Sequence, residues 1–345
     1  MIKYVTGNIL KSDAEAIINT VNCVGIMGKG IALQFKKAFP QNFTAYEKAC
    51  RHKEVRTGKM FIFDRESFIN PKYIINFPTK RHWKAMSKYE DIDTGLIALA
   101  EDIQKLNIKS VAIPPLGCGL GGLAWNIVKE KIVNTFSIIP GIEVYLYEPK
   151  GAPAIKDMPI GTTKPKLTIA RALLIELMHR YSQFAYRLTL LEIQKIAYFL
   201  QETGEPLRLN YVKHFYGPYA HNLNKVLELL EGHYTQGYGD TQKPDVEINL
   251  LPEAYQDAQE FLVKHPETNQ RLEKVTKIID GFETPYGMEL LASVHWVIYH
   301  DNINSEAVAV KKSLKQWNNR KSKLFQDQHI QTAYKRLEEC KKLFL

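Results

Sequence analysis

The chain has 345 residues, 45% of them hydrophobic, which is enough for two hydrophobic cores and too long for one small domain. Its formal net charge is +9, and most of the surplus lies within residues 1–153, which favours a polyanionic partner such as nucleic acid, although many basic enzymes have no such partner. The cysteines are scattered and lack the spacing of metal ligands, so we expect neither disulfides nor a metal. The sequence starts without a signal pattern, and it has no apolar run near the ~20 residues that cross a bilayer. We therefore expect a cytoplasmic protein without a membrane partner.

Residues 1–150 alternate between strand and helix patterns. Strands are predicted at 3–6, 14–21, 61–63, 73–77, 111–113 and 143–147. Helices are predicted at 31–39, where Pro40 ends the pattern, at 89–106, and from residue 124 onward. This alternation is typical of an α/β domain, in which ligands bind beyond the carboxyl ends of the strands. Three loops would emerge there, at 25–30, 79–83 and 117–122.

Two of these loops are rich in glycine, and each joins a predicted strand to a predicted helix. They run from Gly25 to Gly30 and from Gly117 to Gly122. Glycine lets the backbone approach a ligand closely, and the amides at a helix N-terminus attract phosphate, so the pair of loops favours a diphosphate site. One such loop alone is explained equally well by a tight structural turn. Neither loop has the spacing of a P-loop or of a dinucleotide fingerprint.

The second part of the chain follows a stretch with little periodicity. Residues 151–166 contain repeated prolines and glycines and are interpreted as a linker. Beyond it, apolar residues recur at helical spacing, which predicts a mainly α-helical second domain over 167–345. Its helices are expected at 167–184, 188–200, 223–230, 253–263, 269–279, 288–299, 307–317 and 330–343. An extended pair is predicted between 207–215 and 246–250.

Four segments of the first 150 residues together resemble the macrodomain family, whose members bind ADP-ribose. They are Gly7-Asn8-Ile9, Asn19-Thr20-Val21-Asn22, the stretch from Gly25 to Ala32 and the stretch from Pro115 to Gly122. The resemblance implies an α/β macrodomain with a mixed sheet layered between helices, and no cofactor besides the substrate. It places adenine at Asn8 and Ile9 and the distal ribose at Asn22. The implied ADP-ribose-binding residues are Asn8, Ile9, Thr20, Asn22, Gly25, Ile26, Met27, Gly28, Lys29, Gly30, Ile31, Pro115, Gly117, Cys118, Gly119, Leu120, Gly121 and Gly122.

The segment from Asn76 to Trp83 is most similar to the macrodomains of DarG-type antitoxins, which remove ADP-ribose that a partner toxin attaches to DNA bases. This resemblance implies that Lys80 is the catalytic lysine. We interpret Arg81, His82, Trp83 and Lys84 as a DNA-binding stretch, in which cationic side chains contact the phosphates of single-stranded DNA and a base stacks on the indole. A position of Trp83 in the hydrophobic core is an equal alternative.

From the residues alone, several roles are open to Lys80. Its amine could stabilise the leaving base electrostatically, donate a proton to it, or attack the anomeric carbon if its pKa is lowered. The plainer interpretation is a solvated basic rim of Lys80, Arg81 and Lys84. Some relatives that use a lysine also carry an acidic residue in the second glycine loop, where this chain has Gly121 and Ala124. The chemistry is therefore expected to fall to Lys80 and water.

The second domain carries a shorter resemblance. Residues 191–200, with the stretches from Gly204 to Leu207 and from Phe215 to Ala220, resemble the helical module of several antitoxins, including SocA-like proteins. The resemblance implies protein binding, here to a DNA ADP-ribosyltransferase toxin. The aromatic side chains in and near these stretches either anchor that interface or belong to the core. They are Tyr211, Phe215, Tyr216 and Tyr219.

The sequence thus predicts an antitoxin that hydrolyses the N-glycosidic bond between ADP-ribose and a DNA base and that binds its toxin through residues 167–345. Its partners would be ADP-ribosylated single-stranded DNA and the toxin. One alternative is a non-catalytic ADP-ribose reader that neutralises the toxin by protein binding alone. Another is a hydrolase of O-acetyl-ADP-ribose or of ADP-ribosylated protein.

Overall fold

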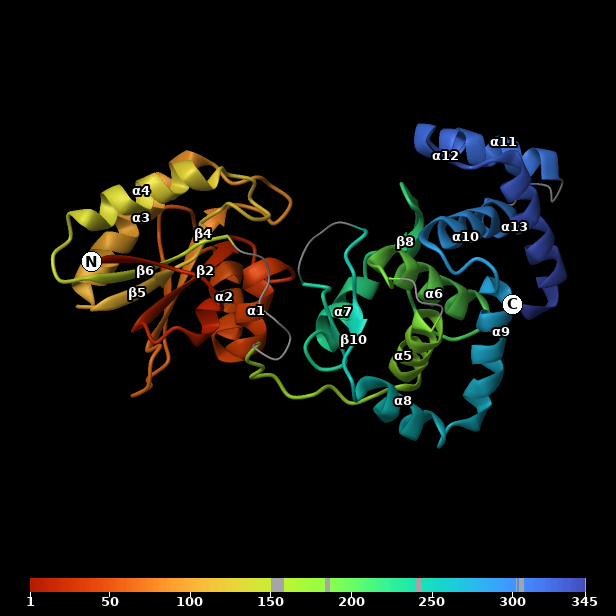
Figure 1. Cartoon of the computed structure of the whole chain (residues 1–345), viewed down its shortest axis with the longest axis horizontal. Coiled ribbons are helices and arrows are strands. Elements are labelled where there is room, and N and C mark those ends of the chain that lie inside the picture. The colour runs from red at the N-terminus through yellow and green to blue at the C-terminus, as the bar shows by residue number, and fades with distance from the viewer. Residues whose placement is uncertain (150–157, 184–186, 240–243, 302, 304–306, 345) are drawn as a thin grey trace. The chain divides into compact units, whose positions relative to one another are not determined.

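The computed structural model describes residues 1–149, 158–183, 187–239, 244–301, 303 and 307–344, and the chain divides into two compact units (Figure 1). Met1–Thr163 form the first unit, and most of the chain from Lys164 to Leu345 forms the second. Residues 151–157 of the predicted linker and residue 184 of a predicted helix lie outside the described part of the chain. The linker and the roles assigned to the two domains therefore stay predictions.

A six-stranded mixed sheet forms the centre of the first unit, as predicted. Its strand order is β1-β6-β5-β2-β4-β3, and all neighbours are parallel except β3, which pairs antiparallel with β4 at the edge. The strands are β1 (Ile2–Val5), β2 (Ala16–Asn22), β3 (Phe61–Asp64), β4 (Tyr73–Lys80), β5 (Ser110–Ile113) and β6 (Glu143–Tyr147). The parallel strands bring their carboxyl ends, and hence the loops that follow, to one edge of the sheet.

Helices cover both faces of this sheet because its central strands are apolar on both sides. Ile18 and Ile75 pack in one core with residues of α3 (Tyr89–Lys105) and α4 (Trp125–Ser137). Their neighbours Ile17 and Ile74 face the opposite core, to which α1 (Gly30–Ala38) contributes Phe35. A short 3-10 helix η1 (Ile9–Lys11) adds Ile9 to that core.

One helix of the first unit is missing from the sequence prediction. Helix α2 (Pro40–Arg51) follows α1 after a single residue, and Pro40 occupies its first turn. A proline ends a preceding helix and is equally well suited to begin the next, because its missing N–H would have no intrahelical partner there. The helix end predicted at Pro40 is therefore confirmed, whereas the helix that begins at the same residue is absent from the prediction.

The second unit is mainly helical, as predicted. Its helices are α5 (Ile169–Ser182), α6 (Leu190–Glu202), α7 (Leu223–Leu230), α8 (Ala254–Leu262), η3 (Pro266–Thr268), α9 (Asn269–Ile279), α10 (Pro285–Tyr299), α11 (Ala307–Trp317), α12 (Asn319–Leu324), α13 (Asp327–Glu339) and η4 (Lys341–Leu343). In the described part of the whole chain, none of the helices is both long and apolar enough to cross a bilayer.

The predicted pairing of 207–215 with 246–250 is wrong. Instead, β7 (Tyr211–His214) forms a hairpin with β8 (Gly217–Ala220), and β10 (Asn249–Leu250) pairs with β9 (Thr235–Gln236). Gly217 has a φ of +91°, which glycine adopts readily, and this allows the tight connection between β7 and β8. A short hairpin costs less loop entropy than a pairing across more than thirty residues, so the local partner wins.

Buried charges lie inside the second unit. Lys321 donates to Glu289 Oε1 at 2.6 Å and to Ser293 Oγ at 3.0 Å, and all three side chains are buried. Lys195 is buried close by, and its Nζ donates to the Pro218 carbonyl at 2.6 Å. Burial lowers the pKa of Lys195 to about 7 and that of Lys321 to about 8. The folded state therefore binds the protons of these two amines less readily than the unfolded chain does.

Candidate functional site

The candidate site is built on the carboxyl ends of β2, β4 and β5. Asn22, the last residue of β2, stands opposite Lys80, the last residue of β4. The first glycine loop leaves β2 and ends at α1, while the second leaves β5 and ends at α4. Neither N-cap residue, Lys29 or Ala124, places a side chain on the first-turn amides of its helix. Both helix starts therefore have the partial positive charge that binds anions.

Asn22 organises the first glycine loop. Its Oδ1 accepts from the amides of Val24 at 2.9 Å and Ile26 at 3.4 Å, and its Nδ2 donates to the Ile26 carbonyl at 2.6 Å. The buried Tyr46 hydroxyl donates to the Asn22 carbonyl at 2.6 Å. These bonds fold the loop back toward the end of β2, with Gly25 at a φ of +78°. The side chain of Asn22 holds the backbone that would surround a ligand, and its predicted contact with the distal ribose stays a prediction.

The second glycine loop is folded tightly on itself. The Leu123 amide donates to the Gly117 carbonyl at 3.1 Å, and the Gly122 amide to the Gly119 carbonyl at 3.1 Å. Gly117 and Gly122 have positive φ values. A Cβ on Gly121 would lie only 2.3 Å from the Gly117 carbonyl oxygen, so the loop needs glycine there for space.

Lys80 connects the two glycine loops. Its Nζ donates to the Leu120 carbonyl in the second loop at 3.1 Å, and its own carbonyl accepts from the Cys23 thiol in the first loop at 3.6 Å. The side chain is partly buried, and this burial lowers the pKa of the amine. A lysine with a lowered pKa exchanges its proton more easily near neutrality. The environment of Lys80 therefore fits a role as an acid or a nucleophile better than it fits the interpretation as part of a solvated basic rim.

The predicted DNA-binding stretch is exposed, but its members differ in what they contact. Arg81 forms a bidentate ion pair with Asp91 at the start of α3, with N–O distances of 2.9 and 3.0 Å. The His82 and Trp83 rings stack at 5.5 Å between centroids, and Lys84 Nζ lies 5.0 Å from the indole centroid. Trp83 is 37% exposed, so the alternative of a core position is wrong.

The remaining predicted ADP-ribose residues surround the same edge. Asn8 accepts from the Leu10 amide at 3.0 Å and so caps η1, while Ile9 is buried. Met27 as a whole residue is 1% exposed and packs in a core cluster with Val21 and Tyr46, so its predicted contact with ADP-ribose stays a prediction. Burial raises the pKa of Cys118 to about 11, which keeps the thiol protonated and fits a packing role. Thr20, Ile31 and Pro115 are partly buried, as are Gly28 and Lys29, whereas Ile26, Gly119, Leu120 and Gly122 are exposed.

Sequence reasoning missed three residues that shape the site. Tyr46 on α2 supports Asn22, Ser87 donates its amide to the Gly121 carbonyl at 3.0 Å, and Met86 lies over Gly122. A Cβ on Gly122 would be 2.1 Å from Met86 Cε. These contacts join segments far apart in the chain, and the sequence has no local pattern that announces them.

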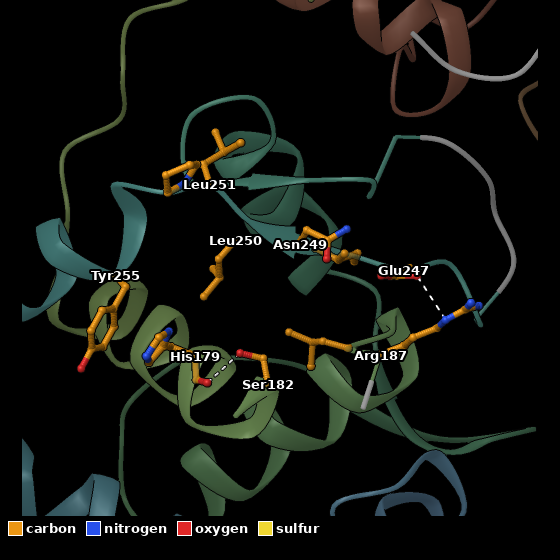
Figure 2. Close-up of a pocket in the computed structure, with 11 residues that line it drawn as sticks. His179, Ser182, Arg187, Glu247, Asn249, Leu250, Leu251 and Tyr255 are labelled. Carbon is orange, nitrogen blue, oxygen red and sulfur yellow. Dashed lines mark hydrogen bonds and ion pairs between the residues drawn. The ribbon is translucent and has the colours of Figure 1, made fainter. Parts of the chain in front are cut away.

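The second unit has two further clusters of polar groups. Figure 2 shows a pocket of about 360 Å³ beside the end of α5, where His179 and Tyr255 lie face to face with ring centroids 3.5 Å apart. Elsewhere, Glu202, His295 and His300 bring potential metal ligands within 4.8 Å of one another. His300 Nε2 lies 3.1 Å from Glu202 Oε1, and His295 Nδ1 lies 2.8 Å from the Tyr198 hydroxyl, whereas the buried His295 Nε2 has no hydrogen-bond partner in the described part of the chain.

Comparison with known proteins agrees with the fold of the first unit. A family model for the Macro domain matches residues 18–132, which confirms the predicted fold class of the first unit. The chain is 45% identical to a DNA ADP-ribosyl glycohydrolase of Thermus aquaticus, over 96% of this chain and 92% of that protein. A DNA ADP-ribosyl transferase-DNA ADP-ribosyl glycohydrolase fusion protein of Thermosipho africanus is 36% identical over 46% of this chain and 45% of its own length. The solved macrodomain of Mycobacterium tuberculosis DarG is 55% identical over 44% of this chain and 99% of its own, with a TM-score of 0.43.

Proposed function

Because the chain belongs to the family of DNA ADP-ribosyl glycohydrolases, we propose that it hydrolyses the N-glycosidic bond between ADP-ribose and a DNA base. The observation that carries this proposal is the position of Lys80, whose amine reaches from the end of β4 to the second glycine loop. The loops at the starts of α1 and α4 would bind the diphosphate through backbone amides. The anomeric carbon of the distal ribose would then lie near the amine.

In the proposed reaction, Lys80 acts as the proton donor. Water attacks the anomeric carbon, the bond from that carbon to the base nitrogen breaks, and the ammonium of Lys80 gives a proton to the departing base. The attacking water loses one proton, which restores the ammonium through solvent. Lys80 donates to a carbonyl in the resting site, and burial lowers its pKa, which makes the ammonium a stronger acid than that of an exposed lysine.

We propose that the DNA is single-stranded where it meets the site. His82, Trp83 and Lys84 form an exposed stacked aromatic pair with a cation beside it, and aromatic faces of this kind bind unstacked bases without reading their sequence. Arg81 is paired with Asp91, so Lys84 is the better candidate for a phosphate contact. The positive surplus of residues 1–153 adds a long-range attraction for the strand.

The test uses an oligonucleotide that carries ADP-ribose on a base. We expect the wild-type protein to release ADP-ribose and restore the base, and Lys80→Ala to release none while still binding free ADP-ribose. Absence of release by the wild type would contradict the enzymatic function, and release from modified protein but not from DNA would favour the alternative substrate. A covalent adduct between ADP-ribose and Lys80, trapped by borohydride, would contradict the proton-donor role and would show that Lys80 acts as a nucleophile.

We further propose that the protein is an antitoxin whose second unit binds an ADP-ribosyltransferase toxin. The fusion relative carries both activities in its name, and the exposed Phe215 in the β7–β8 hairpin offers an aromatic anchor. The full-length Lys80→Ala variant separates binding from hydrolysis. We expect this variant to co-purify with the toxin, and Phe215→Ala in the same background to weaken that association. Loss of all association in the Lys80→Ala protein itself would contradict this role.

A further inference from the structure

The segment from Arg81 to Ser87, which includes the exposed His82–Trp83 pair, is fastened at both ends. At its start, the Arg81 carbonyl accepts from the Cys23 amide of the first glycine loop at 3.2 Å. At its end, the Ser87 amide donates to the Gly121 carbonyl of the second glycine loop at 3.0 Å. One short segment is thus bonded to both loops that would hold ADP-ribose.

Ser87, whose amide makes the second of these backbone hydrogen bonds, has an unusual environment. It is 7% exposed, and in the described part of the chain its hydroxyl has no hydrogen-bond partner. The side chain is packed against the loop, because a Cβ on Gly121 would lie 2.3 Å from Ser87 Oγ and a Cβ on Gly117 would lie 3.1 Å from it. A buried hydroxyl without a partner costs stability, and this one is free to donate to an acceptor that comes within reach.

We propose that Ser87 is a positioning residue that couples ADP-ribose binding at the second glycine loop to DNA binding on the segment Arg81–Ser87. This inference rests on the proposed function. When the loop turns its amides toward the diphosphate, its carbonyls turn with it, and the Ser87 hydroxyl donates to one of them. The new bond fixes the end of the segment and thereby the His82–Trp83 surface on which the strand stacks.

Such a coupling has a thermodynamic consequence. If ADP-ribose strengthens DNA binding by some factor, DNA must strengthen ADP-ribose binding by the same factor. A substrate that carries both groups on one molecule gains from this coupling, because each half orders the site for the other. Free ADP-ribose or undamaged DNA alone meets a less ordered site and binds more weakly.

The experiment measures the affinity of the full-length protein for a fluorescent unmodified single-stranded oligonucleotide, with and without saturating ADP-ribose. For the wild type we expect ADP-ribose to tighten DNA binding by about fivefold or more. For Ser87→Ala we expect that factor to fall to about one and the affinity for ADP-ribose to drop by roughly three- to tenfold, the range of one neutral hydrogen bond. Its melting temperature should stay equal or rise, because the unpaired hydroxyl is gone.

Ser110→Ala is the matched control. The Ser110 hydroxyl accepts from the Glu15 amide at 2.9 Å at the opposite end of β5, so its loss should lower stability and leave the coupling intact. Ser87→Cys places a larger group that is a weak donor at the same position and should also lose most of the coupling.

A Ser87→Ala protein that keeps the full coupling factor would overturn the proposal. A Ser87→Ala protein that melts at a lower temperature and binds ADP-ribose normally would also overturn it, because Ser87 would then contribute to packing alone. Wild-type protein that bound no ADP-ribose would contradict the proposed function instead. If the wild type bound both ligands independently, only the coupling would be disproved.

Discussion

Replacing Gly121 by alanine should deform the second glycine loop, including the neighbouring Leu120 carbonyl that accepts from Lys80 Nζ. The added Cβ would lie 2.3 Å from the Gly117 carbonyl oxygen and equally close to Ser87 Oγ. Ordinary carbon–oxygen contacts are about 3.3–3.6 Å, so the loop backbone must move by roughly 1 Å. Overpacking of this kind costs about 1–3 kcal/mol, and a comparable displacement of the amides that hold a diphosphate should weaken ADP-ribose binding about tenfold or more.

Gly119→Ala is the matched control within the same loop, because a Cβ there would meet nothing within 4 Å. We expect Gly121→Ala to melt at least roughly 2 °C below the wild type and Gly119→Ala to melt within error of it. Thermal denaturation measures both proteins, and calorimetric titration gives the affinity for ADP-ribose. Equal melting temperatures for the two variants would refute the claim that the loop has no room for a side chain at Gly121.

Three further predictions concern other parts of the molecule. If Lys80 is the proton donor, kcat should fall as pH rises through the pKa of its amine. Because burial lowers that pKa, the fall should begin at a lower pH than it would for an exposed lysine. A kcat that rises with pH in this range would contradict the role. Trp83→Ala should weaken binding of single-stranded DNA by about tenfold and leave the affinity for free ADP-ribose unchanged, and equal losses for both ligands would speak against a stacking role. The buried Lys195 has a pKa of about 7 in the folded state, so the unfolded chain binds more protons from there up to the ordinary lysine range, and Lys321 acts in the same direction above its pKa of about 8; stability to urea should therefore increase from pH 7 to pH 9, and Lys195→Met should reduce that slope, with the remainder due to Lys321.

The sheet and the position of the site could be predicted because their signals are local. A strand that ends in a glycine-rich loop and continues into a helix is visible within about twenty residues, and parallel strands bring such loops to one edge. The sequence alone therefore places Lys80 beside both loops. Only the structure gives its contact with the Leu120 carbonyl and the burial that lowers its pKa.

What the sequence could not supply depends on contacts between distant segments. Arg81 looks like a free phosphate ligand in the sequence, but the end of β4 and the start of α3 bring Asp91 to it. The role of Tyr46 depends on the packing of α2 against the end of β2, and α2 itself was hidden by the double meaning of Pro40. The β7–β8 hairpin was missed because its two strands are only four residues long, too short for a clear alternation of apolar and polar residues.

The way in which the segment Arg81–Ser87 is held bears on how this protein can change over evolution. At both ends its links to the glycine loops are bonds between backbone groups, from the Cys23 amide to the Arg81 carbonyl and from the Ser87 amide to the Gly121 carbonyl. Backbone bonds do not depend on side-chain identity, so residues 82–85 can be exchanged while both bonds to the glycine loops remain, whereas Met86 packs against Gly122. The side chains that face the polymer can thus vary at these four positions while the backbone that links them to the loops keeps its place.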